Sequence, residues 1–214
     1  MTGGEPITGL EPLAVSGIVL AGGRSRRFGS DKLAARVGDG TLLDRSFAAL
    51  ASVATDRVVV VAPGDDRVPA PTAGPLRVVA DPEAHGGPLV GLLAGLEAVD
   101  QPLALVVGGD MPALRPDVLR LLARTLASEP TIDGVVLRSR GSLVPLPAAV
   151  RTGAATDWTR RLVGDGERRL GSLFERLPTR ILEEGDWRPL DPDGDTLRDV
   201  DRPGDLPPGD LPPG

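Results

Sequence analysis

A glycine-rich, strongly basic segment is the part of this sequence best suited to chemistry. Residues 22–32 hold the adjacent glycines Gly22–Gly23, then three arginines, then Gly29 and Lys32. Glycines let backbone N–H groups approach a polyphosphate closely, and the cations neutralise its charge. The spacing matches neither GxxxxGK[ST] nor GxGxxG. The segment therefore predicts a polyphosphate-binding loop of another kind, and a plain glycine-rich turn with solvated charges is the alternative.

Asp110 is a candidate metal ligand. It lies in the segment GGDMP, directly after the apolar run 103–107. Magnesium is commonly bound through one or two carboxylates together with substrate phosphates and water. The alternative is an aspartate that caps the turn before Pro112. A cationic glycine-rich loop on the same edge of the fold favours the metal role.

Asp81 and Gly87 are candidates for holding a nucleobase. Asp81 could accept hydrogen bonds from the edge of a base, and Gly87 would let the ring lie against the backbone. A turn carboxylate before Pro82 is the alternative for Asp81. The sole histidine, His85, falls between them, and we interpret it as a surface residue of the loop.

Lys32 and Arg27 are the candidates for acting on a transferring phosphate. Nucleotidyl transfer develops negative charge on non-bridging oxygens and on the leaving pyrophosphate. Cations and a metal stabilise that charge without a protein nucleophile. The sequence offers no evident serine–histidine triad, which agrees with such chemistry. Arg24 and Arg26 could equally be solvated loop charges.

Alternating apolar runs and helical patterns must position these residues. Strands are predicted at 15–21, 58–62, 76–80 and 103–107, and helices at 41–54, 89–96 and 116–127. This alternation predicts an α/β fold with a three-layer, doubly wound, mainly parallel, Rossmann-like sheet. Ligand loops of such sheets follow the carboxyl ends of the strands. We therefore expect segments 22–32, 81–87 and 108–112 to converge on one edge.

The pattern changes after residue 130. A hairpin is predicted from strands 134–138 and 142–149, followed by short helices 154–163 and 168–177 and an edge strand 180–182. The whole chain, 1–214, is expected to form a single domain. Residues 1–13 and about 204–214 are rich in glycine and proline, and we expect them to be disordered tails.

Composition excludes several classes of protein. The formal net charge of −6 argues against nucleic acid as a partner, because phosphate backbones select basic surfaces. The absence of cysteine excludes disulfides and thiolate sites, and a single histidine excludes a multi-histidine zinc site. The sequence shows no secretory signal pattern and no apolar run of about 20 residues. We expect a cytoplasmic protein without a membrane partner.

Four segments in order resemble one family. LAGGRSRRFGSDK resembles the LAGGxSxRxGxDK loop of nucleotidyltransferases, and within them that of the molybdenum cofactor guanylyltransferase (MobA-type) family. The other matching segments are DPEAHGGPLVGLLAGL, VVGGDMPALRPDVL and, near 199–206, DVDRPGDL. Weaker similarities occur in VPLPAAVR and GERRLGSLFERL. The resemblance spans residues 15 to 206, and its first three segments are specific in combination.

The resemblance implies a nucleotidyltransferase fold and a Mg²⁺-dependent transfer of GMP from GTP to molybdopterin carrying molybdenum, with release of pyrophosphate. It implies catalytic roles for Arg27, Lys32 and Asp110, with Mg²⁺ on Asp110. The nucleotide-binding residues would be Leu20, Ala21, Gly22, Gly23, Lys32, Asp81, Gly87 and Asp110. Further partners would be other proteins of molybdenum cofactor biosynthesis, or molybdoenzymes.

The chain departs from that family at two places. Ala62–Pro63 replaces an asparagine that usually follows the second strand. Asp199 and Asp201 replace amides of an NxNTPEDL-like segment, which removes donors and adds negative charge near a polyphosphate.

Alternative functions remain at this stage. One is a related nucleotidyltransferase with another NTP or acceptor, although Gly22 and the segment 87–89 favour GTP over CTP. Another is a non-catalytic nucleotide-binding homologue, which the intact Arg27, Lys32 and Asp110 oppose. A dinucleotide-dependent oxidoreductase ranks last, because GxGxxG is missing.

Overall fold

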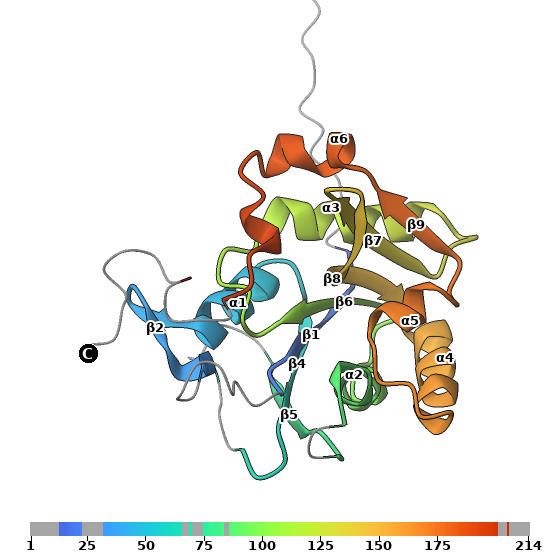
Figure 1. Cartoon of the computed structure of the whole chain (residues 1–214), viewed down its shortest axis with the longest axis horizontal. Coiled ribbons are helices and arrows are strands. Elements are labelled where there is room, and N and C mark those ends of the chain that lie inside the picture. The colour runs from blue at the N-terminus through green and yellow to red at the C-terminus, as the bar shows by residue number, and fades with distance from the viewer. Residues whose placement is uncertain are drawn as a thin grey trace, which may run out of the picture.

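The computed structural model describes residues 13–22, 32–65, 69, 75–83, 86–200 and 205. Within these residues, seven strands form one sheet in the order β5–β4–β1–β6–β8–β7–β9 (Figure 1). Neighbouring strands are parallel, except where β8 pairs antiparallel with β6 and β7. The strands are β1 (Ser16–Leu20), β4 (Asp56–Val61), β5 (Arg77–Ala80), β6 (Leu103–Gly108), β7 (Gly134–Ser139), β8 (Ser142–Arg151) and β9 (Thr179–Leu182). The predicted mainly parallel α/β sheet is confirmed.

Helices cover both faces of this sheet (Figure 1). On one face lie α1 (Leu42–Ala51) and α3 (Pro116–Ser128), and on the other α2 (Pro88–Glu97), α4 (Thr152–Gly164) and α5 (Gly171–Phe174). Successive strand residues alternate between the two cores: Val19 packs with the first layer and Ile18 with the second. Because both faces are covered, all six residues of β6 are buried. No helix in the described part of the chain has the length and apolarity to cross a membrane.

The start of α1 is set by local hydrogen bonds. The Thr41 hydroxyl accepts from the Asp44 N–H, and the Asp44 carboxylate accepts from the Thr41 N–H. This reciprocal cap satisfies backbone donors that the first turn leaves free. The helix ends at Ala51, three residues before the predicted end. Before it lie a short helix η1 (Lys32–Ala34) and a small antiparallel pair, β2 (Arg36–Val37) and β3 (Gly40–Thr41), which the sequence did not predict.

The last third confirms the predicted hairpin and edge strand but corrects one helix. The predicted helix 168–177 is reduced to α5, residues 171–174. The Glu167 carboxylate accepts the Ser172 hydroxyl and the backbone N–H groups of Arg168 and Arg169. These hydrogen bonds lower the pKa of Glu167 to about 2. The Arg168 carbonyl accepts the Leu89 N–H at 3.4 Å, a hydrogen bond outside the helix. After β9 follow α6 (Glu184–Trp187), η2 (Arg188–Leu190) and η3 (Asp195–Leu197).

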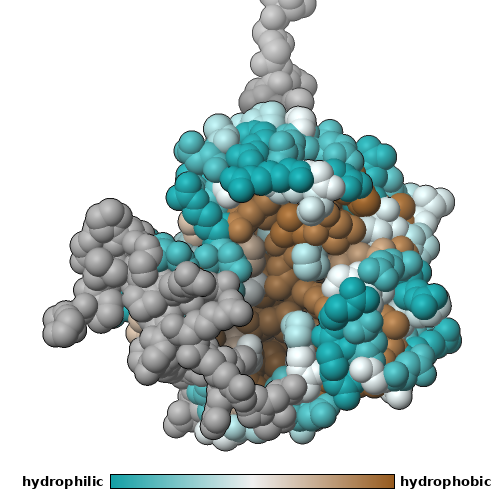
Figure 2. Space-filling model, viewed as in Figure 1, coloured by the Kyte–Doolittle hydropathy of each residue, from teal (hydrophilic) through white to brown (hydrophobic). Residues whose placement is uncertain are grey.

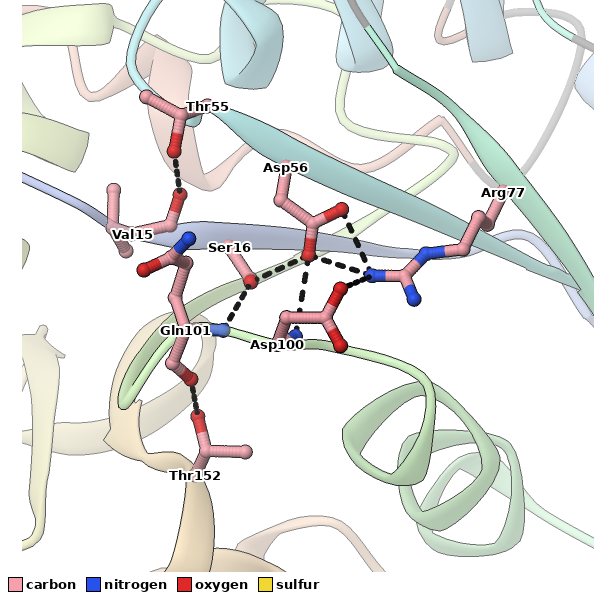
Figure 3. Close-up of polar contacts among 8 residues, drawn as sticks. All are labelled: Val15, Ser16, Thr55, Asp56, Arg77, Asp100, Gln101 and Thr152. Carbon is pink, nitrogen blue, oxygen red and sulfur yellow. Dashed lines mark hydrogen bonds and ion pairs between the residues drawn. The ribbon is translucent and has the colours of Figure 1, made fainter.

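A polar network ties together the amino-terminal ends of the strands (Figure 3). The Asp56 carboxylate at the start of β4 accepts from the Ser16 hydroxyl at 2.8 Å and from Arg77 Nη2 at 2.8 and 2.9 Å. Arg77 also bonds the Asp100 carboxylate at 3.0 Å, and the Gln101 N–H donates to the Ser16 hydroxyl. This end of the sheet is opposite the predicted ligand loops, so the network fixes strand register rather than a site.

Asp56 makes stability depend on pH. Burial alone would raise the pKa of Asp56, but hydrogen bonds from Ser16 and Arg77 outweigh it and lower the pKa. Because the pKa of Asp56 is lower in the folded than in the unfolded state, the ionised carboxylate stabilises the fold above about pH 4. This stabilisation is lost as the pH falls through the folded-state pKa. We expect Asp56→Asn to reduce the free energy of unfolding by about 2 kcal/mol at pH 7, since hydrogen bonds to a charge are lost.

Denaturation at pH 7 and pH 3 measures this effect. The reduction in the free energy of unfolding caused by Asp56→Asn should be smaller at pH 3 than at pH 7. Asp100→Asn is the control, because that carboxylate is 75% exposed and should matter little. An equal loss for Asp56→Asn at both pH values would contradict the titration argument.

Candidate active site

The described ends of the three predicted loops lie together at the carboxyl ends of the parallel strands. The Gly109 N–H donates to the Leu20 carbonyl at 3.0 Å, which joins the loop after β6 to the end of β1. The Ala21 N–H donates to the Val60 carbonyl at 2.8 Å. On the other side, a Cβ built on Gly22 would lie 3.8 Å from Asp81 Oδ2. The end of β1 therefore separates the loop after β5, which holds Asp81 (the Asp81 loop), from the loop between β6 and α3, which holds Asp110 (the Asp110 loop).

Lys32 and Asp110, two of the predicted catalytic residues, form an ion pair. Lys32 Nζ lies 2.9 Å from Asp110 Oδ2. The lysine side chain is 7% exposed and the aspartate side chain 32%, so the ammonium is held inside while one side of the carboxylate faces out. Lys32 is the single lysine of a chain that otherwise uses arginine for its cations. The pair links residues 78 positions apart, at the point where the first and third loops meet.

Glycines make room for this pair. A Cβ on Gly108 would lie 2.6 Å from Asp110 Oδ1, so the carboxylate folds back over this residue. A Cβ on Gly109 would lie 3.4 Å from both the Leu20 carbonyl oxygen and the Ala21 Cα. The two glycines of the GGD segment thus let Gly109 lie against the end of β1 and the carboxylate fold over Gly108. Sequence reasoning noted Asp110 but missed this purpose of the glycines before it.

Asp81 is a buried carboxylate with two different surroundings. Its Oδ1 accepts the Glu83 N–H at 3.0 Å, which is the turn role considered from sequence. Its Oδ2 faces Gly22 and Gly91, at 3.8 and 3.4 Å from the Cβ positions of these glycines. One oxygen therefore stabilises the turn, and the other faces residues without side chains.

Gly87 is required for a packing reason. Its φ of +84° is unfavourable for residues with a Cβ, and a Cβ here would lie 2.9 Å from the Arg168 Cβ and 3.1 Å from the Arg168 carbonyl oxygen. Arg168 Nη2 also lies 3.3 Å from Glu83 Oε2. The loop before α5 thus packs against the predicted base-binding loop, a contact that the sequence did not reveal.

Several predicted features lie outside the described residues. They are Gly23, Arg24, Arg26, Arg27, Gly29, His85, Asp201 and all of the predicted tails 1–13 and 204–214 except residues 13 and 205. The roles proposed for Gly23 and Arg27 therefore stay predictions from sequence. Ala62, which replaces the family's asparagine, is described: its backbone N–H lies 3.9 Å from the Cβ position of Gly22.

The C-terminal segment returns to the site. The Val200 N–H donates to the Asp110 carbonyl at 3.1 Å, and the Val200 side chain is 3% exposed. Val200 packs with Val37 and Leu42. The similarity of DVDRPGDL to a family segment pointed to this stretch, but the contact with Asp110 came from the structure.

The protein's possible metal-binding groups at this site suit a metal ion that arrives together with a bound polyphosphate. Among the described residues, no group of three or more histidine, cysteine, aspartate or glutamate side chains could hold a metal ion. Asp110 is a partly exposed carboxylate beside Lys32. Magnesium carried by a polyphosphate needs only one or two protein carboxylates. Asp110 therefore fits as the protein ligand of such an ion.

A Rossmann-like sheet with a buried lysine paired to an aspartate at its carboxyl edge defines the chain as an α/β protein of the kind that binds ligands at this edge. The family described as "MobA-like NTP transferase domain" matches residues 17–181. The chain belongs to this family.

Two relatives support the same assignment. A "Probable molybdenum cofactor guanylyltransferase" of Chloroflexus aggregans is 35% identical over 203 residues, covering 91% of this chain and 92% of the relative. The "Molybdenum cofactor guanylyltransferase" of Desulfosudis oleivorans is 33% identical over 182 residues, covering 84% and 86%. The predicted resemblance to the MobA-type family is confirmed.

Solved structures share the fold. Molybdopterin-guanine dinucleotide biosynthesis protein A from Archaeoglobus fulgidus matches with a TM-score of 0.73 at 22% identity, covering 89% of this chain and 94% of that one. A 4-diphosphocytidyl-2C-methyl-D-erythritol synthase from Anaerococcus prevotii matches with a TM-score of 0.61 at 13% identity, covering 79% and 86%. Because these structures are under 25% identical, they show the fold alone.

Proposed function

We propose that this protein transfers GMP from GTP to the molybdopterin form of the molybdenum cofactor and releases pyrophosphate, with Mg²⁺ on Asp110. The Lys32–Asp110 pair at the meeting point of the loops carries the proposal. It places a buried cation and a partly exposed carboxylate beside the end of β1. The names of the relatives from Chloroflexus aggregans and Desulfosudis oleivorans support the choice of reaction.

In the proposed reaction, a phosphate oxygen of the acceptor attacks the α-phosphorus of GTP. The bond from the α-phosphorus to the bridging oxygen breaks, and this oxygen leaves with pyrophosphate. Bound Mg²⁺ would supply a positive charge that polarises the phosphates. Lys32 exchanges its ion pair with Asp110 for a phosphate oxygen and stabilises the charge that develops there. No protein nucleophile is needed.

The nucleobase is proposed to bind on the other side of β1. Asp81 Oδ2 faces Gly22 and Gly91, neither of which carries a side chain. A carboxylate can accept hydrogen bonds from neighbouring N–H groups of guanine, which cytosine and adenine do not present in the same arrangement. This chemistry supports GTP as the donor.

The acceptor is proposed to bind over β6 and β8. Figure 2 shows a hollow lined by apolar surface over this part of the sheet, with hydrophilic rims. The pairing of β8 with β6 ends at Ala148 of β8, opposite Val106 of β6. The first half of β8 extends beyond this pair. Its residues Leu143, Val144, Pro145 and Leu146 are only partly buried. Partly exposed apolar side chains beside a phosphate site suit an acceptor with a flat ring and a phosphate group.

The experiment is pyrophosphate release by the full chain with Mg²⁺, each NTP in turn, and molybdenum-loaded molybdopterin. We expect release with GTP and acceptor together, at least about tenfold above release with ATP or CTP, which corresponds to roughly 1.4 kcal/mol of discrimination. Calorimetry of the three nucleotides with Mg²⁺ is the control for binding without turnover. A preference for CTP would indicate a related transferase, and GTP binding without release would indicate a non-catalytic homologue.

A further inference from the structure

We propose that residues 187–200, the C-terminal strap, position the Asp110 loop for metal-dependent nucleotide binding, and that Thr196 and Asp191 are positioning residues. The inference rests on the proposed function of Asp110. The match to the family model ends at residue 181, before the strap begins. In Figure 1 the orange-red strap runs from α6 over α3 toward α1.

The strap contacts the Asp110 loop near both ends of the loop. The Val200 N–H donates to the Asp110 carbonyl at 3.1 Å. At the other end, the Thr196 hydroxyl accepts the Arg115 N–H, also at 3.1 Å, where α3 begins. Between these points the Met111 N–H donates to the buried Ser46 hydroxyl of α1 at 3.1 Å. The strap therefore supplies two of the hydrogen bonds that tie this loop to the rest of the fold, beside those of Ser46, Leu20 and Lys32.

A buried carboxylate holds the strap in shape. Asp191 is 0% exposed, and its two oxygens accept the N–H groups of Asp195 at 3.1 Å and Thr196 at 2.8 Å. Arg115 approaches from the loop, with Nε 3.7 Å from Asp191 Oδ1 and Nη2 2.9 Å from Asp195 Oδ2. A buried charge with several donors strongly favours one arrangement, because any other leaves it unpaired.

The beginning of the strap is anchored independently of the loop. Trp187 is fully buried, and its Nε1 donates to the Arg138 carbonyl at 3.1 Å. The strap is thus fixed on β7 at one end and on Asp110 at the other. Because the Asp110 carboxylate also pairs with Lys32, a shift of the loop backbone would move the carboxylate relative to the lysine.

Thr196→Val and Thr196→Ser form the matched test. Thr196 is 0% exposed; valine keeps the shape and removes the acceptor, whereas serine keeps the acceptor. Amide hydrogen exchange of residues 108–116 in the nucleotide-free protein measures directly how firmly the hydrogen bonds of the loop are held. Titration of Mg²⁺ into protein with GTP gives the metal concentration for half-maximal binding. Asp193→Asn, an exposed carboxylate of the strap, is the control.

In Thr196→Val we expect exchange at Arg115 and the Mg²⁺ midpoint each to rise about fivefold, the effect of one lost hydrogen bond. Affinity for GTP without metal should not change, and Thr196→Ser should restore both values. Asp191→Asn should act in the same direction. Unchanged exchange in Thr196→Val, or faster exchange with an unchanged midpoint, would overturn the proposal. If the wild type binds GTP without any metal dependence, the proposed function fails instead, and exchange alone then decides whether the strap holds the loop.

Discussion

Asp110→Ala is expected to lower kcat for GMP transfer by about a thousandfold or more, because the metal-borne charge stabilisation of the transition state is lost. Asp110→Asn should be nearly as damaging, since a neutral amide is a poor ligand for a hard cation. An asparagine would still place an oxygen within reach of the Lys32 ammonium, which lies 2.9 Å from the carboxylate. Asparagine also serves well in a turn. The asparagine variant therefore tests metal binding rather than loop structure.

The measurements are steady-state rates at saturating Mg²⁺ and GTP binding with and without metal. Affinity for metal-free GTP should hold or improve in Asp110→Asn, because a negative charge near the phosphates is removed. Asp117→Asn, with its side chain 68% exposed on α3, is the matched control and should keep its rate. Near-normal activity and melting temperature in Asp110→Asn would refute the metal role.

Lys32→Met is expected to lower kcat by about a hundredfold to a thousandfold, the cost of removing one preplaced group that stabilises developing charge. Methionine keeps an unbranched side chain of similar length, and the lysine side chain that it replaces is 7% exposed. Lys32→Arg should restore only a small part of the rate. A guanidinium is broader and planar, whereas an ammonium is compact.

For both Lys32 variants, the measurements are the rate of pyrophosphate release and the affinity for GTP obtained by titration. Arg36→Met is the control, because Arg36 is an exposed cation of β2 near Lys32 in sequence. Since Lys32 is the single lysine, an amine-directed reagent offers a second measurement. GTP with Mg²⁺ should protect Lys32 from modification. Full activity in Lys32→Arg would show that any positive charge suffices.

The sequence by itself determined the fold class and the edge of the sheet where the candidate site lies. Continuous apolar runs such as 103–107 predict strands buried on both faces, and their alternation with helical patterns leaves few arrangements other than a parallel sheet. In such a sheet the loops after the strands share one edge. For this reason Lys32 and Asp110 could be expected to lie close together although they are far apart in sequence.

Only the tertiary structure decided what lies against these loops. The contact of Gly87 with Arg168 and the hydrogen bond of Val200 to Asp110 join segments that no local pattern relates. The predicted helix 168–177 was too long for a similar reason. The Arg168 carbonyl accepts the Leu89 N–H of a distant segment instead of an N–H of its own helix, and a tertiary hydrogen bond of this kind overrides helical periodicity. Periodicity reports which face of an element is buried, whereas the partner of that face is fixed by the way the whole chain packs.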